Sequence, residues 1–125
     1  MDLRLQTRPS WPTVVLVSAA TATSGLVHLV RGIGGQGDYV SLLDLGVGTV
    51  GLLTAWCLVG RHCFEARLAS ALLAWSSVLG TALALGLGSP GQGPREATPA
   101  DVTILVLALL VLRLLHGGTR PQPRR

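Results

Sequence analysis

The sequence contains no lysine and no asparagine, and it has few charged residues of any kind. Charged residues make up 13% of the 125-residue chain, whereas soluble domains carry about 25%. Apolar residues make up 49% even without the 16 glycines. A water-soluble fold of this length would lack the polar surface needed to cover so many apolar side chains. We therefore expect a single domain that lies in a membrane.

Cysteine is also scarce, and no sequence motif indicates catalysis. Cys57 and Cys63 lie six residues apart, which matches neither a CxxC pair nor a zinc-ligand spacing. His62 and His116 are expected near the same membrane surface, but a haem would need histidines that face each other within the hydrocarbon. The chain has neither a nucleophile elbow nor a zinc-protease helix motif. We therefore expect no enzyme activity, no cofactor and no metal site.

The chain does have four long apolar runs, separated by a glycine-rich segment at 31–38, a short polar turn at 61–67 and a loop with three prolines at 89–101. At 1.5 Å per residue, about 20 residues span the hydrocarbon core of a bilayer. The last run, 102–115, is short and needs flanking residues to reach that length. The pattern predicts an all-α integral membrane protein with four transmembrane helices in an up-down bundle. The expected segments are a cytoplasmic lead at 1–10, a transmembrane domain at 11–116 with helices at about 11–30, 39–60, 68–87 and 100–116, and a disordered cytoplasmic tail at 117–125.

The first apolar run leaves a second interpretation open, that of a cleaved signal peptide. Arg4 and Arg8 would form its basic region and 14–19 its apolar core, with a cleavage site at Ala20-Thr21-Ala22. Against cleavage, the run stays hydrophobic beyond that site. Three more apolar runs follow, so the chain is expected in the membrane in either case.

The distribution of arginine predicts the orientation of the helices. The arginines sit singly at the ends of apolar runs and not along one face with interleaved aromatics, so we expect the lipid bilayer and no nucleic acid as a partner. Seven arginines fall on the side of the amino terminus, against Arg31 and Arg95 on the other. Positive residues favour the cytoplasm, which places both termini on the cytoplasmic side of a bacterial cell membrane. The seven are Arg4, Arg8, Arg61, Arg67, Arg120, Arg124 and Arg125.

Small residues spaced four apart allow helices to approach closely in a bilayer. The second run contains Gly46-x-Gly48-x-x-Gly51, the spacing of a dinucleotide-binding fingerprint, but that motif needs a preceding strand. We therefore assign these glycines to helix packing. The fourth run has few small residues, and we expect it to face lipid, Ala108 included, while the first three helices form the core. The residues predicted to pack helices are Gly25, Gly48, Gly51, Gly80, Ala84 and Gly88.

Asp44 is the clearest candidate for a functional side chain, because an ionisable residue inside a membrane is costly. It lies five residues into the second run, about 7–8 Å below the outer boundary. His28 and Arg31, at the outer end of the first helix, are expected at a similar depth. Either would neutralise the carboxylate and join the two helices. Asp44 could instead bind a proton or a cation, and the sequence leaves both roles open.

From these features we expect a non-enzymatic membrane protein, either an accessory or scaffold subunit or a small homo-oligomer, that acts through helix–helix contacts. Its partner would be a second copy or another membrane subunit. Four short helices rich in glycine and alanine leave little room for a substrate cavity within one copy. The alternative is a small transporter or channel subunit, with Asp44 and His28 on an ion or proton pathway.

Overall fold

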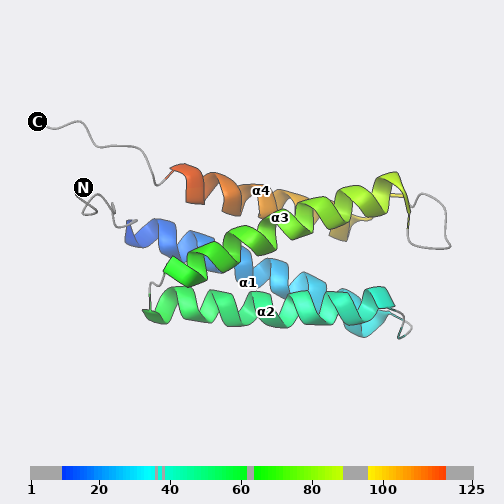
Figure 1. Cartoon of the computed structure of the whole chain (residues 1–125), viewed down its shortest axis with the longest axis horizontal. Helices are drawn as coiled ribbons and strands as arrows, with labels where there is room; N and C mark the ends of the chain where they lie inside the picture. The colour runs from blue at the N-terminus through cyan, green and yellow to red at the C-terminus, as the bar shows by residue number, and fades with distance from the viewer. Residues whose placement is uncertain (1–9, 36, 38, 62–63, 89–95, 118–125) are drawn as a thin grey trace, which may run out of the picture.

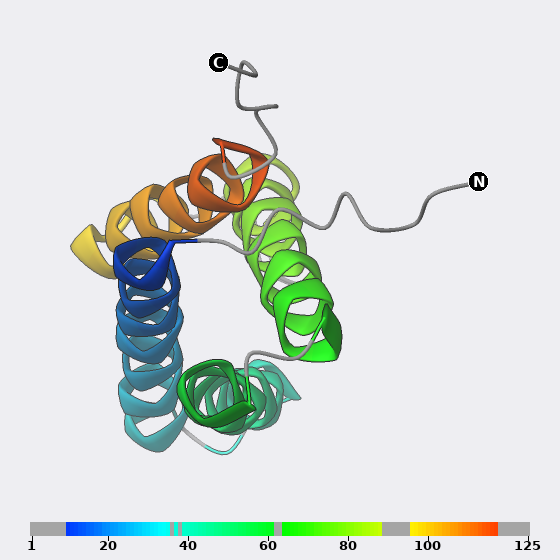
Figure 2. The ribbon, with the colours of Figure 1, turned by 90° about the vertical axis from the view of Figure 1, so that its left-hand side faces the viewer.

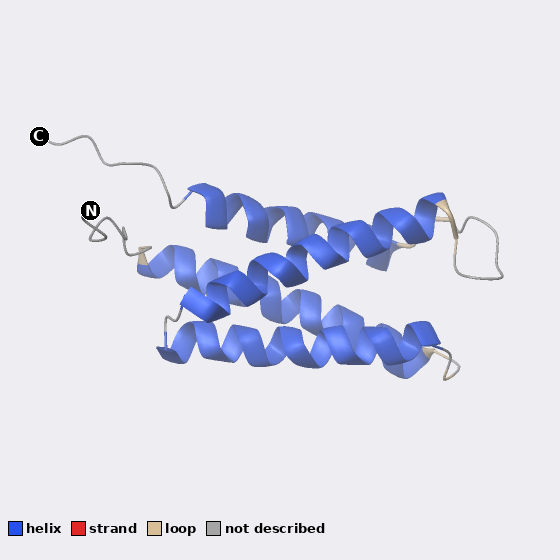
Figure 3. Ribbon diagram, viewed as in Figure 1, coloured by secondary structure: helices blue, strands red, loops and turns tan. Residues whose placement is uncertain are grey.

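The computed structural model describes residues 10–35, 37, 39–61, 64–88 and 96–117. All of its regular elements are helices: α1 (Trp11–Gly34), α2 (Tyr39–Arg61), α3 (Phe64–Gly86) and α4 (Pro99–Gly117) (Figure 3). Each is long and apolar enough to cross a membrane. The lead at 1–9 and the tail at 118–125 lie outside the described residues, as do His62 and Cys63.

Two helices differ in length from their apolar runs, each by one turn. α1 continues through Gly34, four residues past the expected end, although Gly32 and Gly34 are weak helix formers. α3 begins at Phe64, four residues before the expected start. Its first turn includes Glu65, and an acidic side chain there complements the partial positive charge of a helix amino terminus. The apolar run therefore underestimates a helix wherever a polar turn continues it.

The four helices surround a common axis, with α1 and α3 on opposite sides (Figure 2). α1 contacts α2 and α4, and α3 contacts the same two helices. The most extensive contact joins α1 and α2, and the least extensive joins α2 and α3. The ends of α2 and α4 lie at the same end of the molecule as the starts of α1 and α3 (Figure 1).

Glycine explains why α1 and α2 approach so closely. A Cβ atom added to Gly25 would lie 3.0 Å from the Gly48 carbonyl oxygen, and one added to Gly48 would lie 2.7 Å from the Gly25 carbonyl oxygen. A Cβ on Gly51 would lie 3.2 Å from the Gly25 Cα. The two backbones thus touch where side chains would separate them. One turn away, Ser18 Oγ donates to the Ala55 carbonyl oxygen across the same interface, at 2.9 Å.

α4 contributes to the centre of the bundle, and the expectation that Ala108 faces lipid is wrong. Ala108 is 2% exposed, and Ile104 and Val111 on the same face are also buried. The small side chain of Ala108 lets α4 pack against α1 and α3 without a pair of small residues four apart. A single alanine flanked by branched side chains can form a close contact that the spacing rule does not detect.

Apolar side chains cover the outside of the bundle as well as its core. Trp56, Leu83 and Val106 are among many large hydrophobic residues that are exposed on all four helices. Large apolar patches are rare on monomeric soluble proteins. Several polar side chains, in contrast, are buried inside, among them His28, Ser70 and Asp101.

Candidate functional site

Asp44 lies in the second turn of α2 and faces two basic side chains of α1. Its Oδ1 atom is 2.8 Å from His28 Nδ1, and its Oδ2 atom is 3.6 Å from Arg31 Nε. His28 and Arg31 are three residues apart, a spacing that places both on one face of a helix. The structure thus brings together the three intramembrane polar candidates, and both pairings considered for Asp44 are present at once.

A fourth ionisable residue, Asp101 of α4, joins this group. Its Oδ1 atom is 2.7 Å from Arg31 Nη1, which is the shorter of the two ion pairs of Arg31. Asp101 is 1% exposed, so it is more deeply buried than Asp44. The sequence does not indicate this ion pair, because Asp101 lies at the edge of the fourth apolar run, 70 positions after Arg31.

Thr98 and Asp101 begin α4 with a reciprocal cap. The Thr98 N–H and hydroxyl donate to Asp101 Oδ2, at 2.9 and 2.6 Å, and the Asp101 N–H donates to Thr98 Oγ1 at 3.3 Å. Pro99 occupies the first helical position, where no N–H is needed. The segment Thr98-Pro99-Ala100-Asp101 resembles the capping box, which places an acidic side chain three residues after the cap. That signal would have identified the role of Asp101 in the cap, though not its ion pair.

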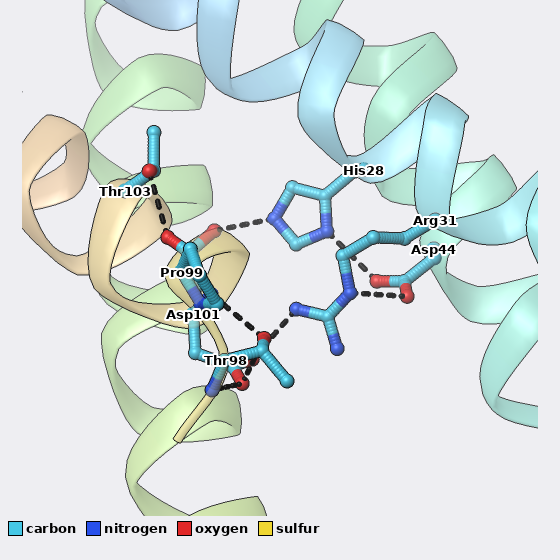
Figure 4. A network of polar contacts seen from close by, with 8 residues as sticks. His28, Arg31, Asp44, Thr98, Pro99, Asp101 and Thr103 are labelled. Atoms are coloured by element: carbon cyan, nitrogen blue, oxygen red, sulfur yellow. Dashed lines mark hydrogen bonds and ion pairs between the residues drawn. The ribbon is translucent and has the colours of Figure 1, made fainter.

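Ser77 of α3 completes a polar cluster to which every helix contributes. Its Oγ atom lies 3.4 Å from His28 Nε2. Because a carboxylate only accepts hydrogen bonds, His28 Nδ1 donates to Asp44, and Nε2 of the neutral ring then accepts from Ser77. We call this cluster the four-helix network (Figure 4). Its members are His28 and Arg31 from α1, Asp44 from α2, Ser77 from α3, and Thr98 and Asp101 at the start of α4.

The ionisable side chains of the four-helix network are paired with one another. Two carboxylates face one guanidinium, and His28 donates a hydrogen bond to one of them, Asp44. An unpaired aspartate near the centre of a transmembrane helix costs about 2.5–3.5 kcal/mol on insertion scales. Pairing offsets that cost and also joins segments that are distant in the chain. The arrangement therefore suits a structural role for all four ionisable side chains.

A cleft of about 420 Å³ lies between α2 and α3, beside the four-helix network. Its walls are mainly apolar, and His28, Arg31, Asp44 and Asp101 also line it. Its volume falls within the range of about 300–1,000 Å³ that is usual for small-molecule sites.

The small residues of α3 line this cleft and do not form a close helix contact within the chain. Gly80, Ala84 and Gly88 are all among the lining residues. A Cβ atom added to Gly80 would meet no atom within 4 Å. The structure therefore brings Gly25, Gly48 and Gly51 together at the α1–α2 interface, whereas Gly80 and Ala84 of α3, and Gly88 just beyond its end, line the cleft.

A second, much smaller cavity of about 20 Å³ lies inside the bundle. His28 and Ser77 line both this cavity and the cleft. Ser70, also in its lining, is 1% exposed, and its hydroxyl has no hydrogen-bond partner among the described residues. A volume of about 10–15 Å³ is enough for one water molecule, so this cavity is far too small for a substrate.

The remaining candidate ligands lie apart from one another. Cys57 is exposed, and His116 Nδ1 lies 3.0 Å from the carbonyl oxygen of Leu112 in its own helix. Within the described parts of the chain, no group of three His, Cys, Asp or Glu side chains could hold a metal ion. Comparisons with protein-family models, with curated proteins and with solved structures found no match to the chain.

Proposed function

We propose that the chain is a non-enzymatic membrane protein whose four helices cross the bacterial cytoplasmic membrane as an up-down bundle. Both termini would lie in the cytoplasm. Helix lengths of 19 to 24 residues correspond to about 28–36 Å, close to the thickness of a hydrocarbon core. The apolar exterior and the excess of arginine toward one side support the same arrangement.

The observation that supports a binding or scaffold role is that polar contacts join all four helices on one side of the bundle, while a cleft remains between α2 and α3. The four-helix network pairs its charges internally and joins all four helices. The α2–α3 side, in contrast, retains a cleft of about 420 Å³. A rigid bundle with one open side suits a protein that acts by holding another membrane component. The α2–α3 cleft is therefore the contact surface of this proposal.

Site-specific photocrosslinking in native membranes tests the contact surface. Leu83 and Leu79 are both 57% exposed and lie one turn apart on α3, but Leu83 lines the cleft and Leu79 does not. A photoreactive amino acid at Leu83 should form a discrete adduct, while the same probe at Leu79 should label bulk lipid. Equal, diffuse labelling at both positions would contradict a dedicated contact at the cleft. Failure of the chain to remain in salt-washed membranes would contradict the proposal as a whole.

A second candidate is a small transporter or channel subunit with Asp44 and His28 on the pathway. The observation in its favour is that His28 lines both the cleft and the interior cavity. Beyond that cavity, buried apolar side chains such as Val17, Leu58 and Leu112 fill the bundle toward the end where α1 begins and α4 ends. A pathway would therefore need α1 or α4 to move.

Flux measurements separate the two candidates. Purified protein in liposomes should move neither protons nor alkali cations faster than empty liposomes if its role is contact alone. Flux that is abolished by Asp44→Asn in a normally folded variant would favour the transporter and contradict the non-enzymatic contact role. The variant Thr49→Ala is a suitable control, because the exposed Thr49 hydroxyl donates to the Leu45 carbonyl oxygen of its own helix, away from the residues that line the cleft.

A further inference from the structure

We infer that the α2–α3 cleft binds one glycerolipid of the outer leaflet, with an acyl chain between the helices and an ester carbonyl oxygen on Arg31. The inference rests on the proposed insertion in the membrane and deepens the proposed contact by naming the occupant. Three features of the cleft carry it: its size and shape, the third nitrogen of the Arg31 guanidinium, and the charges around that nitrogen.

The size and shape of the cleft suit an acyl chain. Its volume of about 420 Å³ is lined from Tyr39 to Val47 on α2 and from Ser76 to Ala84 on α3, so the cleft extends along both helices. A transmembrane helix is about 10–12 Å across, whereas an acyl chain is narrower and can follow the length of the gap. Gly80 and Ala84 line the cleft one turn apart, and Gly88 lines it just beyond the end of α3. Their lack of bulk keeps that side of the cleft clear for a chain.

Arg31 provides the polar end of the site. Its Nε atom contacts Asp44 and its Nη1 atom contacts Asp101. The third nitrogen, Nη2, carries no dashed line to any of the residues drawn in Figure 4. Arg31 lines the cleft with 21% of its side chain exposed. A guanidinium donates up to five hydrogen bonds and accepts none, so the complementary group in a ligand is an oxygen acceptor.

The surrounding charges favour an uncharged acceptor over an anion. Asp44 and Asp101 both contact Arg31, so two carboxylates compensate its single positive charge. A phosphate would be repelled by these carboxylates, whereas a carbonyl oxygen needs only the N–H donor. The expected depth of the site in the membrane also suits an ester carbonyl. Asp44 lies within the first two turns of α2, which places it near the boundary between headgroups and hydrocarbon, where the ester groups of a lipid lie. Tyr39, at the start of α2, also lines the cleft and can contact the headgroup region.

Native mass spectrometry of the purified full-length protein tests this inference. The probe is phosphatidylethanolamine with two ester-linked oleoyl chains, compared with an analogue whose chains are joined by ethers and lack the carbonyl oxygen. The parent protein should retain one ester lipid per chain and bind the ether analogue at least about tenfold more weakly, as expected for the loss of a hydrogen bond to a charged donor. Equal retention of both lipids would overturn the role of the carbonyl group.

Matched glycine variants locate the lipid without disturbing the four-helix network. A Cβ at Gly80 or Gly46 meets no atom within 4 Å, but Gly80 lines the cleft and Gly46 does not. Gly80→Leu should bind the ester lipid at least about tenfold more weakly, and Gly46→Leu should bind it as the parent does. Unchanged retention in Gly80→Leu, or a dimer in place of the lipid adduct, would overturn the inference. A protein adduct at Leu83 in the crosslinking experiment would also overturn it, while leaving the proposed contact function intact.

Discussion

Arg31 is the residue on which the polar interior depends most. Its guanidinium lies between the carboxylates of Asp44 and Asp101 and connects α2 to α4 through α1. The two carboxylates are not equivalent. Asp44 also contacts His28, at 2.8 Å. Asp101 is nearly inaccessible and forms the shorter of the two ion pairs of Arg31. Loss of Arg31 would therefore affect Asp101 more severely than Asp44.

This difference predicts which second substitution rescues an Arg31 variant. Arg31→Leu should lower the free energy of unfolding by about 3–5 kcal/mol, because the buried carboxylate of Asp101 loses the guanidinium that faces it. Adding Asp101→Leu should recover part of the loss, and adding Asp44→Leu should recover less, because Asp44 can remain bonded to His28. Thermal unfolding in detergent, measured for the three variants beside the parent, gives the order. A larger rescue by Asp44→Leu would contradict the dominance of the Arg31–Asp101 pair.

The sequence indicates half of the four-helix network. His28, Arg31 and Asp44 lie at similar depths in consecutive antiparallel helices, so their proximity follows from the apolar runs alone. Asp101 belongs to the fourth helix, and its position depends on which helices are neighbours around the bundle. Spacing along the chain carries no information about that order. Ser77 could not be distinguished from the other hydroxyl residues of α3 for the same reason.

At the scale of helices, the α1–α2 pair is held by backbone contact. Gly48→Leu should lower the free energy of unfolding by about 1–3 kcal/mol, the usual cost of overpacking, because its Cβ would lie 2.7 Å from the Gly25 carbonyl oxygen. Gly46→Leu places the same side chain in open space on the same helix. It should leave stability close to that of the parent. Denaturation followed by circular dichroism measures both, and equal effects would contradict a close contact at Gly48.

α4 should tolerate little change on the face that packs against α1 and α3. Ala108→Leu should lower the free energy of unfolding by about 1–3 kcal/mol, because Ala108 is 2% exposed and the added atoms have no room. Ala82→Leu, at an exposed position of α3, is the matched control and should be neutral. Stability in detergent provides the measurement. If Ala108→Leu were as harmless as the control, α4 would not pack as described.

At the scale of the whole molecule, the number of helices and their approximate ends could be predicted, while the arrangement of their faces could not. Runs of about 20 apolar residues are a strong signal because the thickness of a bilayer sets their length. The spacing of small residues is a weaker one. Gly25 with Gly48 and Gly51 lies in a tight interface, whereas Gly80, Ala84 and Gly88 line an open cleft. The same pattern serves both environments, so spacing alone does not distinguish a contact from a gap.

The proposed topology can be tested with single cysteines at two glutamates. Glu65 begins α3 and Glu96 precedes α4, and both are exposed. In a background with Cys57 and Cys63 replaced by serine, an impermeant thiol reagent added to intact cells should modify Glu96→Cys and not Glu65→Cys. The reverse result would mean that the bundle has the opposite orientation. Modification at both positions would mean that fewer helices cross the membrane.

The placement of the two carboxylates along the chain also bears on the order of assembly during synthesis. Arg31 and Asp44 both emerge from the ribosome with α1 and α2, so they can neutralise each other before the second half of the protein exists. Asp101 emerges last, with α4, and finds Arg31 already held in the first hairpin. In the proposed membrane topology, the guanidinium would therefore be paired once the first hairpin has formed. Capture of Asp101 by Arg31 would then retain the fourth helix and complete the bundle.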